Sequence, residues 1–120
     1  MRIGELATKS GVSVRALRYY EEQRLLAAER TTSGQRVYPP KALDRVQLIQ
    51  QLYAAGLPSK TILDLLPCVD AGVSTPESLA RLSLERNRIN DQINSLIATR
   101  DRLDAVIAVA TDSTHPCHTP

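Results

Sequence analysis

The sequence contains no Phe and no Trp, and only four Tyr and two Cys among its 120 residues. Without Phe or Trp, the core must be built mainly from Leu, Ile, Val and Ala. Cys68 and Cys117 show no disulfide-framework spacing, which indicates reduced thiols in a reducing compartment. No stretch resembles a signal peptide, and no apolar run approaches the length that spans a bilayer. We therefore expect a cytoplasmic protein without a membrane partner.

The length and the charge distribution restrict the function further. A chain of 120 residues has room for a modest core, but not for an enzyme-sized cleft beside a second functional unit. Residues 1–60 hold ten Lys and Arg against five Asp and Glu, whereas residues 61–120 hold five against eight. A basic half beside an acidic half suits a polyanion-binding head joined to a separate assembly element.

Residues 13–22 predict a helix with two different faces. Ser13 is a good N-cap, because its hydroxyl can accept a hydrogen bond from an amide of the first turn. Val14 and Leu17 fall on one apolar face of this helix. The side chains that project to other sides, where they can touch a nucleic acid, are those of Arg15, Arg18 and Tyr19.

The preceding segment predicts a first helix that crosses the second at close range. Ala7 supplies a small residue at the crossing, Gly11 tolerates positive φ in the turn, and Leu17 faces back from the second helix. A helix-turn-helix of this kind docks its second helix in the DNA major groove, where arginine pairs with guanine or clamps phosphate. A plain helical hairpin with a solvated basic face is the alternative on this stretch alone.

Residues 29–38 predict a small β-hairpin around a Ser33-Gly34 turn, with Gly34 supplying the positive φ that the turn requires. Arg30 and Arg36 are expected on opposite arms. Beside a helix-turn-helix, such a hairpin is a wing whose basic side chains grip the DNA backbone.

Two further helices are expected after the hairpin. The first opens at Pro39-Pro40 and ends before Gly56. The second runs from Ser59, the expected N-cap, to Pro67, and the segment from Cys68 to Thr75 reads as a linker. Lys60 lies in the first turn against the helix dipole, a placement that makes sense if a phosphate binds there.

Pro76 starts an uninterrupted run to about Ala110 that has no Gly or Pro inside it, which predicts one continuous helix. The heptad a and d positions are Leu79, Leu82, Arg86, Ile89, Ile93, Leu96, Arg100, Leu103, Ile107 and Ala110. A helix of this length spans roughly 50 Å at about 1.5 Å per residue, more than the rest of the chain can cover. We therefore expect a homodimer whose seam includes Leu82, Ile89, Ile93, Leu96, Leu103 and Ile107. A helix folded back on its own head would cover only part of that seam.

The ordered set of motifs resembles the MerR family of bacterial transcription regulators over about residues 1–110. The residues that carry the resemblance are Ile3-Gly4-Glu5-Leu6-Ala7, Gly11-Val12-Ser13, Leu17-Arg18-Tyr19-Tyr20-Glu21, Gly34-Gln35-Arg36-Val37-Tyr38 and Ala55-Gly56-Leu57. The resemblance implies a mainly α fold with a winged helix-turn-helix head, a two-helix connector and a long antiparallel coiled-coil helix. It also implies a homodimer that binds a pseudo-palindromic operator in double-stranded DNA and bends and untwists the promoter spacer, so that RNA polymerase engages both promoter hexamers.

Carried onto this sequence, the resemblance assigns functional residues and domain boundaries. The expected DNA-binding residues are Ser13, Arg15, Arg18, Tyr19, Arg30, Gly34, Arg36, Tyr38, Ser59 and Lys60. The expected domains are a DNA-binding head at 1–70, a linker at 71–75, the dimerisation helix at 76–110 and a flexible tail at 111–120. Many members have glycine where this chain has Arg24, which would cost on the order of 1 kcal/mol if that backbone takes positive φ.

Three alternative functions compete with this one. The main alternative is a metal or redox sensor using His115, Cys117 and His118, with Cys68 as a further candidate, because thiolate and imidazole suit zinc or copper. The chain departs here from the metal-sensing branch of the family, which places paired cysteines near the end of the coiled coil, because it has Ala110 near the first position and only one later cysteine. An architectural or excisionase-like DNA-bending protein is a weaker one. An enzyme with Cys117 as nucleophile lacks the fixed base and pocket that activation requires. We therefore expect no catalytic activity, no cofactor and no resident metal, and the sequence does not identify a small-molecule effector.

Overall fold

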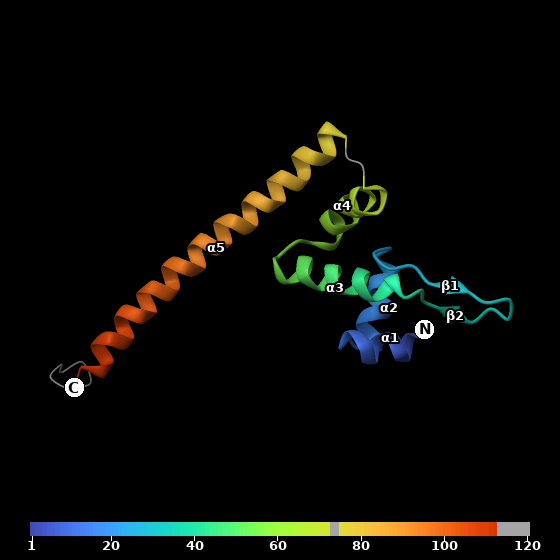
Figure 1. Ribbon diagram of the computed structural model, residues 1–120, viewed down its shortest axis with the longest axis horizontal. Coiled ribbons are helices and arrows are strands. Elements are labelled where there is room, and N and C mark those ends of the chain that lie inside the picture. Colours follow the sequence, from blue (N-terminus) through green and yellow to red (C-terminus); the bar gives the residue numbers. More distant parts are fainter. Residues whose placement is uncertain (73–74, 113–120) are drawn as a thin grey trace. The chain divides into compact units, whose positions relative to one another are not determined.

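A computed structural model describes residues 1–72 and 75–112. Within these residues the elements follow in the order α1 (Ile3–Ser10), α2 (Val14–Glu22), β1 (Glu29–Arg30), β2 (Arg36–Val37), α3 (Lys41–Ala54), α4 (Ser59–Ala71) and α5 (Pro76–Thr111) (Figure 1). The chain forms two compact units, residues 1–78 and the residues from 79 onward. The expected mainly α fold with a small hairpin and a long last helix is confirmed.

The turn between α1 and α2 forms as its sequence predicts. Gly11 takes a φ of 73° at the end of α1, and its N–H donates to the carbonyl oxygen of Ala7. The Ala16 N–H donates to Ser13 Oγ at 3.1 Å, so Ser13 is the N-cap of α2. The side chains of Leu6 on α1 and Leu17 on α2 are completely buried. The helix-turn-helix therefore rests on two local backbone signals and on one buried apolar residue from each helix.

Arg24 follows α2 with a φ of 63°, and it is the one described residue other than glycine with positive φ. The Leu25 N–H donates to the carbonyl oxygen of Tyr20 at 2.9 Å, which closes the helix end and holds Arg24 in the left-handed region. An L-residue in that region costs about 1–2 kcal/mol because Cβ crowds the following carbonyl oxygen. The expected strain at Arg24 is therefore present.

Arg24→Gly is expected to stabilise the protein by about 0.5–1 kcal/mol. Glycine removes the left-handed penalty, and the greater freedom of the unfolded chain offsets part of the gain. Urea denaturation followed by circular dichroism measures the change. Gln23→Gly is the matched control, because Gln23 has an ordinary φ of −81°, so glycine there can only destabilise. Equal effects at the two positions would contradict the strain assignment.

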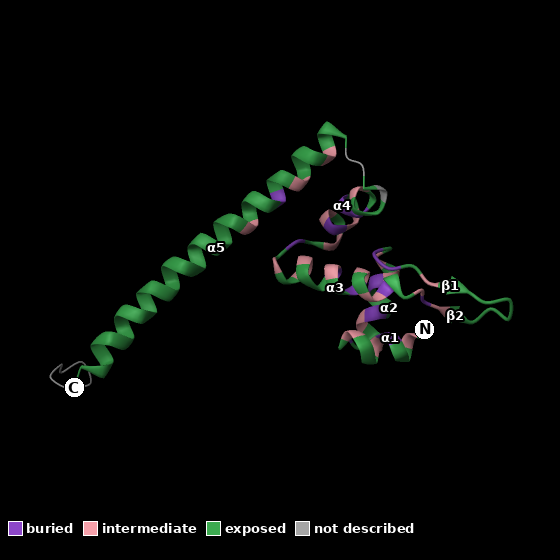
Figure 2. Cartoon of the chain, viewed as in Figure 1, coloured by how far each residue is buried: buried purple, intermediate pink, exposed green. Residues whose placement is uncertain are grey.

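The core of the first unit contains two tyrosines in place of the missing Phe and Trp. Tyr38 is 1% exposed, and Tyr20 stacks on Tyr53 with ring centroids 5.8 Å apart. Figure 2 shows the buried residues on the helices of this unit. The fully buried aliphatic side chains of this unit include Leu6, Leu17, Leu25, Val46, Ile49 and Ile62.

Helices α3 and α4 form the connector, and α4 is longer than expected. The predicted end at Pro67 is wrong, because α4 continues to Ala71 and closes at Gly72 with a φ of 62°. Pro67 lacks an N–H and so removes one hydrogen bond inside the helix. Burial of Leu65 and Leu66 holds the preceding turn in place. The extra turn also places Asp70 in an ion pair with Arg45 of α3.

Helix α5 spans Pro76–Thr111, as the absence of Gly and Pro after Pro76 predicts. Thr75 Oγ1 accepts a hydrogen bond from the Ser78 N–H at 3.2 Å, which caps its start. Nearly all of α5 is exposed (Figure 2). Among the described helices, none is both long and apolar enough to cross a membrane.

Candidate nucleic-acid interface

Helix α2 presents its basic residues on the face away from the core. Arg15 and Arg18 are exposed, and Tyr19 keeps 47% of its surface. On the opposite face, Leu17 and Tyr20 are buried. The buried face therefore holds α2 in the core, while the side chains of Arg15, Arg18 and Tyr19 stay accessible on the other face.

The wing is a short antiparallel ribbon in which Arg30 pairs with Arg36 and Glu29 pairs with Val37. Gly34 takes a φ of 86° in the turn, as predicted. The turn is organised by its own polar groups, because the Gln35 N–H donates to Thr31 Oγ1 at 3.1 Å and Arg30 Nη1 donates to the Gly34 carbonyl oxygen at 2.9 Å. The two predicted arginines therefore lie opposite each other on neighbouring arms (Figure 1).

Glu21 ties the wing to α2. Arg36 Nη1 lies 2.9 Å from Glu21 Oε2, and the Tyr38 hydroxyl donates to Glu21 Oε1. The Glu21 side chain is only 15% exposed, whereas the Arg36 side chain is 46% exposed, so the carboxylate is largely shielded from water while the guanidinium stays partly solvated. Arg36 and Tyr38 of the wing thereby keep a set position relative to Arg18 on α2. The sequence does not predict the role of Glu21, because no local signal links this residue to Arg36, 15 positions later.

Tyr38 was predicted as a DNA contact, yet its ring is buried. In this conformation the side chain is not available to DNA, and its hydroxyl is committed to Glu21. We therefore reassign Tyr38 as a residue that positions the wing. The sequence held a hint of this role, because a protein without Phe or Trp has few other large rings for its core.

Burial raises the pKa of Tyr38 from its ordinary 10.0 to about 12, with smaller raising contributions from the hydrogen bond to Glu21 and from the charge of that carboxylate. Because the folded-state pKa lies above the unfolded one, the protonated hydroxyl stabilises the fold below about pH 10, and this contribution is lost as pH rises toward about 12. In an alkaline titration of tyrosinate absorbance, the difference between wild type and Tyr38→Phe should show a midpoint near pH 12. Glu21→Gln should lower that midpoint. A wild-type midpoint at the ordinary value would contradict the network.

Arg2 joins the wing, a position that no motif in the sequence predicts. The Tyr38 N–H donates to the Met1 carbonyl oxygen at 2.6 Å, so the first residues run beside β2. Arg2 Nη2 then donates to Gln35 Oε1 at 2.5 Å. A third exposed arginine is thus gathered at the wing, next to Arg30 and Arg36.

The start of α4 differs from the prediction at Ser59. Pro58 is the N-cap and makes no side-chain cap, whereas Ser59 is the first helical residue. The Ser59 hydroxyl is hydrogen-bonded to the Tyr53 hydroxyl at 2.5 Å. No acidic residue lies in the first turn, and Lys60 is exposed there. The N-terminal end of α4 therefore presents positive charge and amides without a side-chain cap, a combination that attracts anions.

A family model described as MerR HTH family regulatory protein matches residues 1–67, more than half of the chain. The chain belongs to the MerR family. The matched segment includes α1, α2, the wing, α3 and most of α4, which are the elements that carry the candidate interface. The resemblance inferred from the motifs is therefore confirmed, and MerR-family regulators are not enzymes.

Curated relatives and solved structures of MerR-family members cover different parts of the chain. The nodulation protein NolA of Bradyrhizobium sp. strain NC92 is 37% identical over 103 residues, which are 85% of this chain but 41% of NolA. The chain thus spans less than half the length of that relative. The regulator CueR of Yersinia pestis is 30% identical over 108 residues, covering 88% of this chain and 78% of CueR.

Two solved structures resemble the chain over nearly its whole length. A MerR-family transcriptional regulator from Listeria monocytogenes has a TM-score of 0.83 at 29% identity, covering 98% of this chain and 91% of that one. HiNmlR, a MerR-family regulator lacking the sensor domain and bound to promoter DNA, has a TM-score of 0.78 at 27% identity, covering 94% and 91%. These neighbours match α5 as well as the head.

The MerR family includes metal-bound members, such as PbrR691 from Ralstonia metallidurans CH34 in complex with lead(II), which has a TM-score of 0.62 at 26% identity and covers 91% of this chain and 86% of that one. In this chain the metal candidates His115, Cys117 and His118 lie outside the described residues. Cys68 is a half-buried free thiol. Within the described ranges, no three His, Cys, Asp or Glu residues gather closely enough to hold a metal ion. The metal- or redox-sensing alternative therefore stays a prediction.

Proposed function

We propose that this MerR-family chain is a sequence-specific DNA-binding transcription regulator that acts as a homodimer on promoter operators. The observation that carries the proposal is the exposed face of α2, where Arg15, Arg18 and Tyr19 stand beside a wing that Glu21 holds in place. An α-helix with such a face fits the major groove, and a basic wing fits the neighbouring phosphates. Residues 1–70 are the proposed DNA-binding part and residues 76–110 the proposed dimerisation part.

The positive groups fall into two sets on the proposed interface. We assign those of α2 to base edges, because the groove admits a helix and arginine pairs bidentately with guanine. We assign those at the wing and Lys60 to phosphates, together with the amides at the start of α4. The other predicted contact residues are structural parts of these elements. Ser13 is the N-cap of α2, Gly34 forms the turn of the wing, and Ser59 is the first residue of α4.

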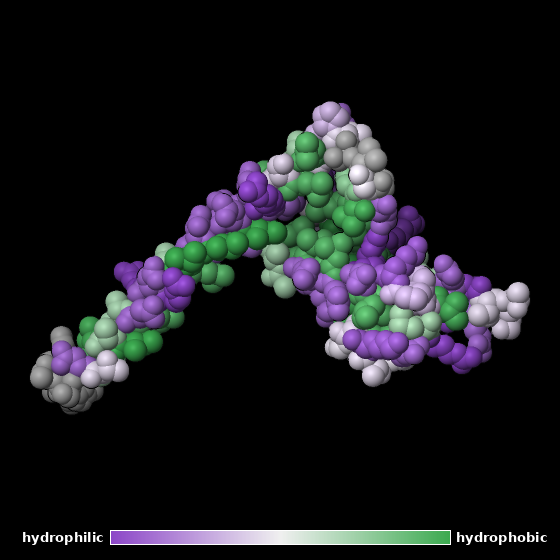
Figure 3. Space-filling model, viewed as in Figure 1, coloured by the Kyte–Doolittle hydropathy of each residue, from purple (hydrophilic) through white to green (hydrophobic). Residues whose placement is uncertain are grey.

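Helix α5 supplies the proposed dimer interface. Figure 3 shows a hydrophobic band along this helix, and four of the predicted seam residues are large apolar side chains that remain exposed in the single chain. These are Ile93 at 48%, Leu96 at 69%, Leu103 at 56% and Ile107 at 57% exposure. The other two predicted seam residues, Leu82 and Ile89, are half-buried. A band of this length suits a second copy of the same helix.

A twofold dimer holds two heads at one separation, so it reads two half-sites of a pseudo-palindromic operator. We propose that binding bends and untwists the promoter spacer, which changes how RNA polymerase meets the two promoter hexamers. This mechanism needs no small-molecule effector, and the nature of any effector is left open.

Footprinting on genomic fragments tests the proposal, beginning with the region upstream of the protein's own gene. The expected result is one protected, pseudo-palindromic site within a promoter. Transcription in vitro from that promoter should then change when the protein is added, and the change should depend on spacer length. Binding without any effect on transcription would support the architectural alternative, and equal affinity for all fragments would overturn the proposal.

A further inference from the structure

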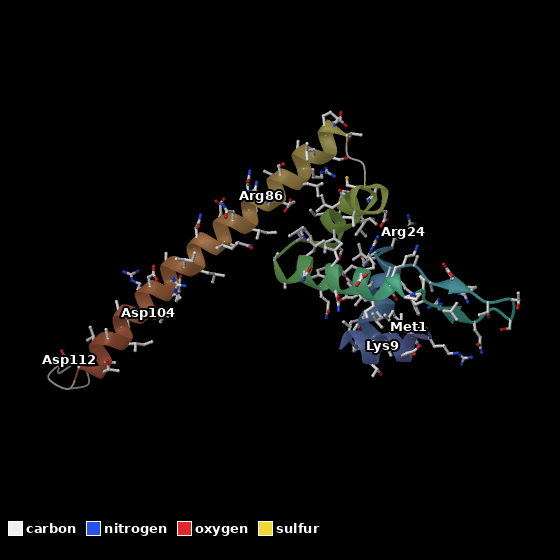
Figure 4. All side chains as sticks on the ribbon, viewed as in Figure 1. Met1, Lys9, Arg24, Arg86, Asp104 and Asp112 are labelled. Atoms are coloured by element: carbon white, nitrogen blue, oxygen red, sulfur yellow. The ribbon has the colours of Figure 1, made fainter. Side chains whose placement is uncertain are left out.

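Two arginines interrupt the apolar band of α5. Arg86 and Arg100 occupy a positions of the heptad pattern, and both are exposed in the single chain. Figure 4 places Arg86 in the first half of the helix and Asp104 in the second. A charge inside a coiled-coil seam costs stability unless the partner helix provides a counter-charge. These two arginines therefore restrict how two copies of the chain can pair.

A parallel pairing is disfavoured by both arginines. In a parallel dimer each a position faces the same position of the other helix, so Arg86 would meet the partner's Arg86 and Arg100 would meet the partner's Arg100. Two like-charge contacts would lie within the seam and weaken it. In an antiparallel dimer each a position instead faces a d position, which is apolar throughout this helix.

One antiparallel register gives every seam residue a partner. With the twofold axis midway between Ile93 and Leu96, Ile93 faces the partner's Leu96 and Arg86 faces the partner's Leu103. The remaining layers pair Ile89 with the partner's Arg100, Leu82 with the partner's Ile107, and Leu79 with the partner's Ala110. A slip of one heptad in either direction leaves two seam residues of each chain without a partner and loses their apolar burial.

We propose that this register is selected by an ion pair between Arg86 and the partner's Asp104, formed twice across the twofold axis. The inference rests on the proposed homodimer. Asp104 follows Leu103 at heptad position e. Because Leu103 faces the partner's a position in this antiparallel register, Asp104 lies beside that same a position. Both charged groups are exposed, and within the described residues neither has an ion-pair partner of its own. In the two slipped registers, the place beside Arg86 is taken by the partner's Ile97 or the partner's Thr111, which carry no charge.

Arg100 has no comparable effect on the register. Its Nη2 lies 3.1 Å from Asp101 Oδ1 of the same helix. In the proposed register Arg100 faces the partner's Ile89, and the residue beside it at position e is the partner's Asn90, which carries no charge. A charge that is already paired within its own helix discriminates little between registers. Arg100 therefore provides a matched control for Arg86.

Charge exchange tests the ion pair. Arg86→Glu and Asp104→Arg each convert two attractive contacts into repulsive ones, so each should raise the dissociation constant of the dimer about tenfold. The double variant Arg86→Glu/Asp104→Arg restores opposite charges and should recover most of the wild-type affinity in sedimentation experiments. In the control Arg100→Glu/Asp104→Arg the exchanged charges are neighbours four residues apart on one helix and do not meet across the dimer, so no recovery of dimer affinity is expected.

Cysteine cross-linking tests the register separately, in a Cys68→Ser/Cys117→Ser background. Arg86→Cys/Leu103→Cys should form a disulfide-linked dimer on mild oxidation, because each new thiol faces its counterpart in the partner chain. Arg86→Cys/Leu96→Cys is the control for a slipped register. In the proposed register those thiols are separated by seven residues, about 10 Å along the helix, too far for a disulfide.

The outcomes separate this inference from the proposed function. A wild-type protein that sediments as a monomer would overturn the homodimer itself. A dimer that cross-links only through the control pair would overturn the register and leave the homodimer standing. A dimer that cross-links as expected, but whose charge-exchange variant recovers no affinity, would overturn the role of Arg86 and the partner's Asp104 alone.

Discussion

Arg18→Ala should lower the affinity for the operator about 10- to 100-fold while leaving the fold intact. The side chain is exposed on the free face of α2, and its removal takes no apolar surface from the core. An arginine that reads a base contributes about 1–3 kcal/mol of discrimination.

Binding to operator and to random DNA at two salt concentrations would define the role of Arg18. A base contact loses discrimination at one position of the operator, whereas a phosphate contact loses affinity for all sequences and lowers the salt dependence. Arg102→Ala, an exposed change on α5, removes the same charge away from the proposed interface and should leave operator affinity nearly unchanged. Unchanged affinity in Arg18→Ala, or loss of its fold, would refute the assignment of this face.

Arg36 is a less direct probe of DNA contact than Arg18. In the wing it is bound to Glu21, whose side chain is 15% exposed. Arg36→Ala would therefore remove a positive charge and also leave a shielded carboxylate with one partner fewer. Weaker DNA binding in Arg36→Ala would therefore combine a lost DNA contact with a displaced wing. Tyr38→Phe, which removes the other hydrogen bond to Glu21, should be measured beside Arg18→Ala and Arg36→Ala to separate the two effects.

Ile93→Asp should convert the dimer into a folded monomer. In the proposed seam, the new carboxylate would be buried without a partner, twice in each dimer, which costs about 3–5 kcal/mol or more. Because Ile93 is 48% exposed in the single chain, the head does not depend on it for folding. Analytical ultracentrifugation at micromolar concentration should show the monomer, and circular dichroism should show a retained helical fold.

The monomer should also bind DNA differently. Two heads held at one separation bind both half-sites together, whereas a single head binds one half-site weakly. Footprints of Ile93→Asp should therefore shrink to half-sites and require much higher protein concentration. Asn94→Asp, a neighbouring change at a surface heptad position, should leave both dimer and footprint unaltered. If Ile93→Asp remains a full dimer, the promoter-bending mechanism loses its geometric basis.

Several features followed from sequence alone because they depend on residues close together in the chain. The cap at Ser13, the positive φ at Gly11 and Gly34, and the uninterrupted α5 each need only a local backbone preference or a regular spacing. The strain at Arg24 was anticipated from the family resemblance instead, because many members have glycine at this position, and Arg24 indeed takes a positive φ. Periodicity also identified the apolar band that suits a partner helix.

Other features were decided by tertiary structure, because they depend on which distant groups meet. Ser59 looks like a cap in sequence, but Tyr53 takes its hydroxyl. Tyr38 looks like a DNA contact, but it lies in the core and donates to Glu21. A hydroxyl can satisfy its hydrogen bond with any suitable group in reach, and a ring can be buried or exposed at similar local cost. Only the folding of the wing against α2 decides between those partners, and local sequence does not encode that contact.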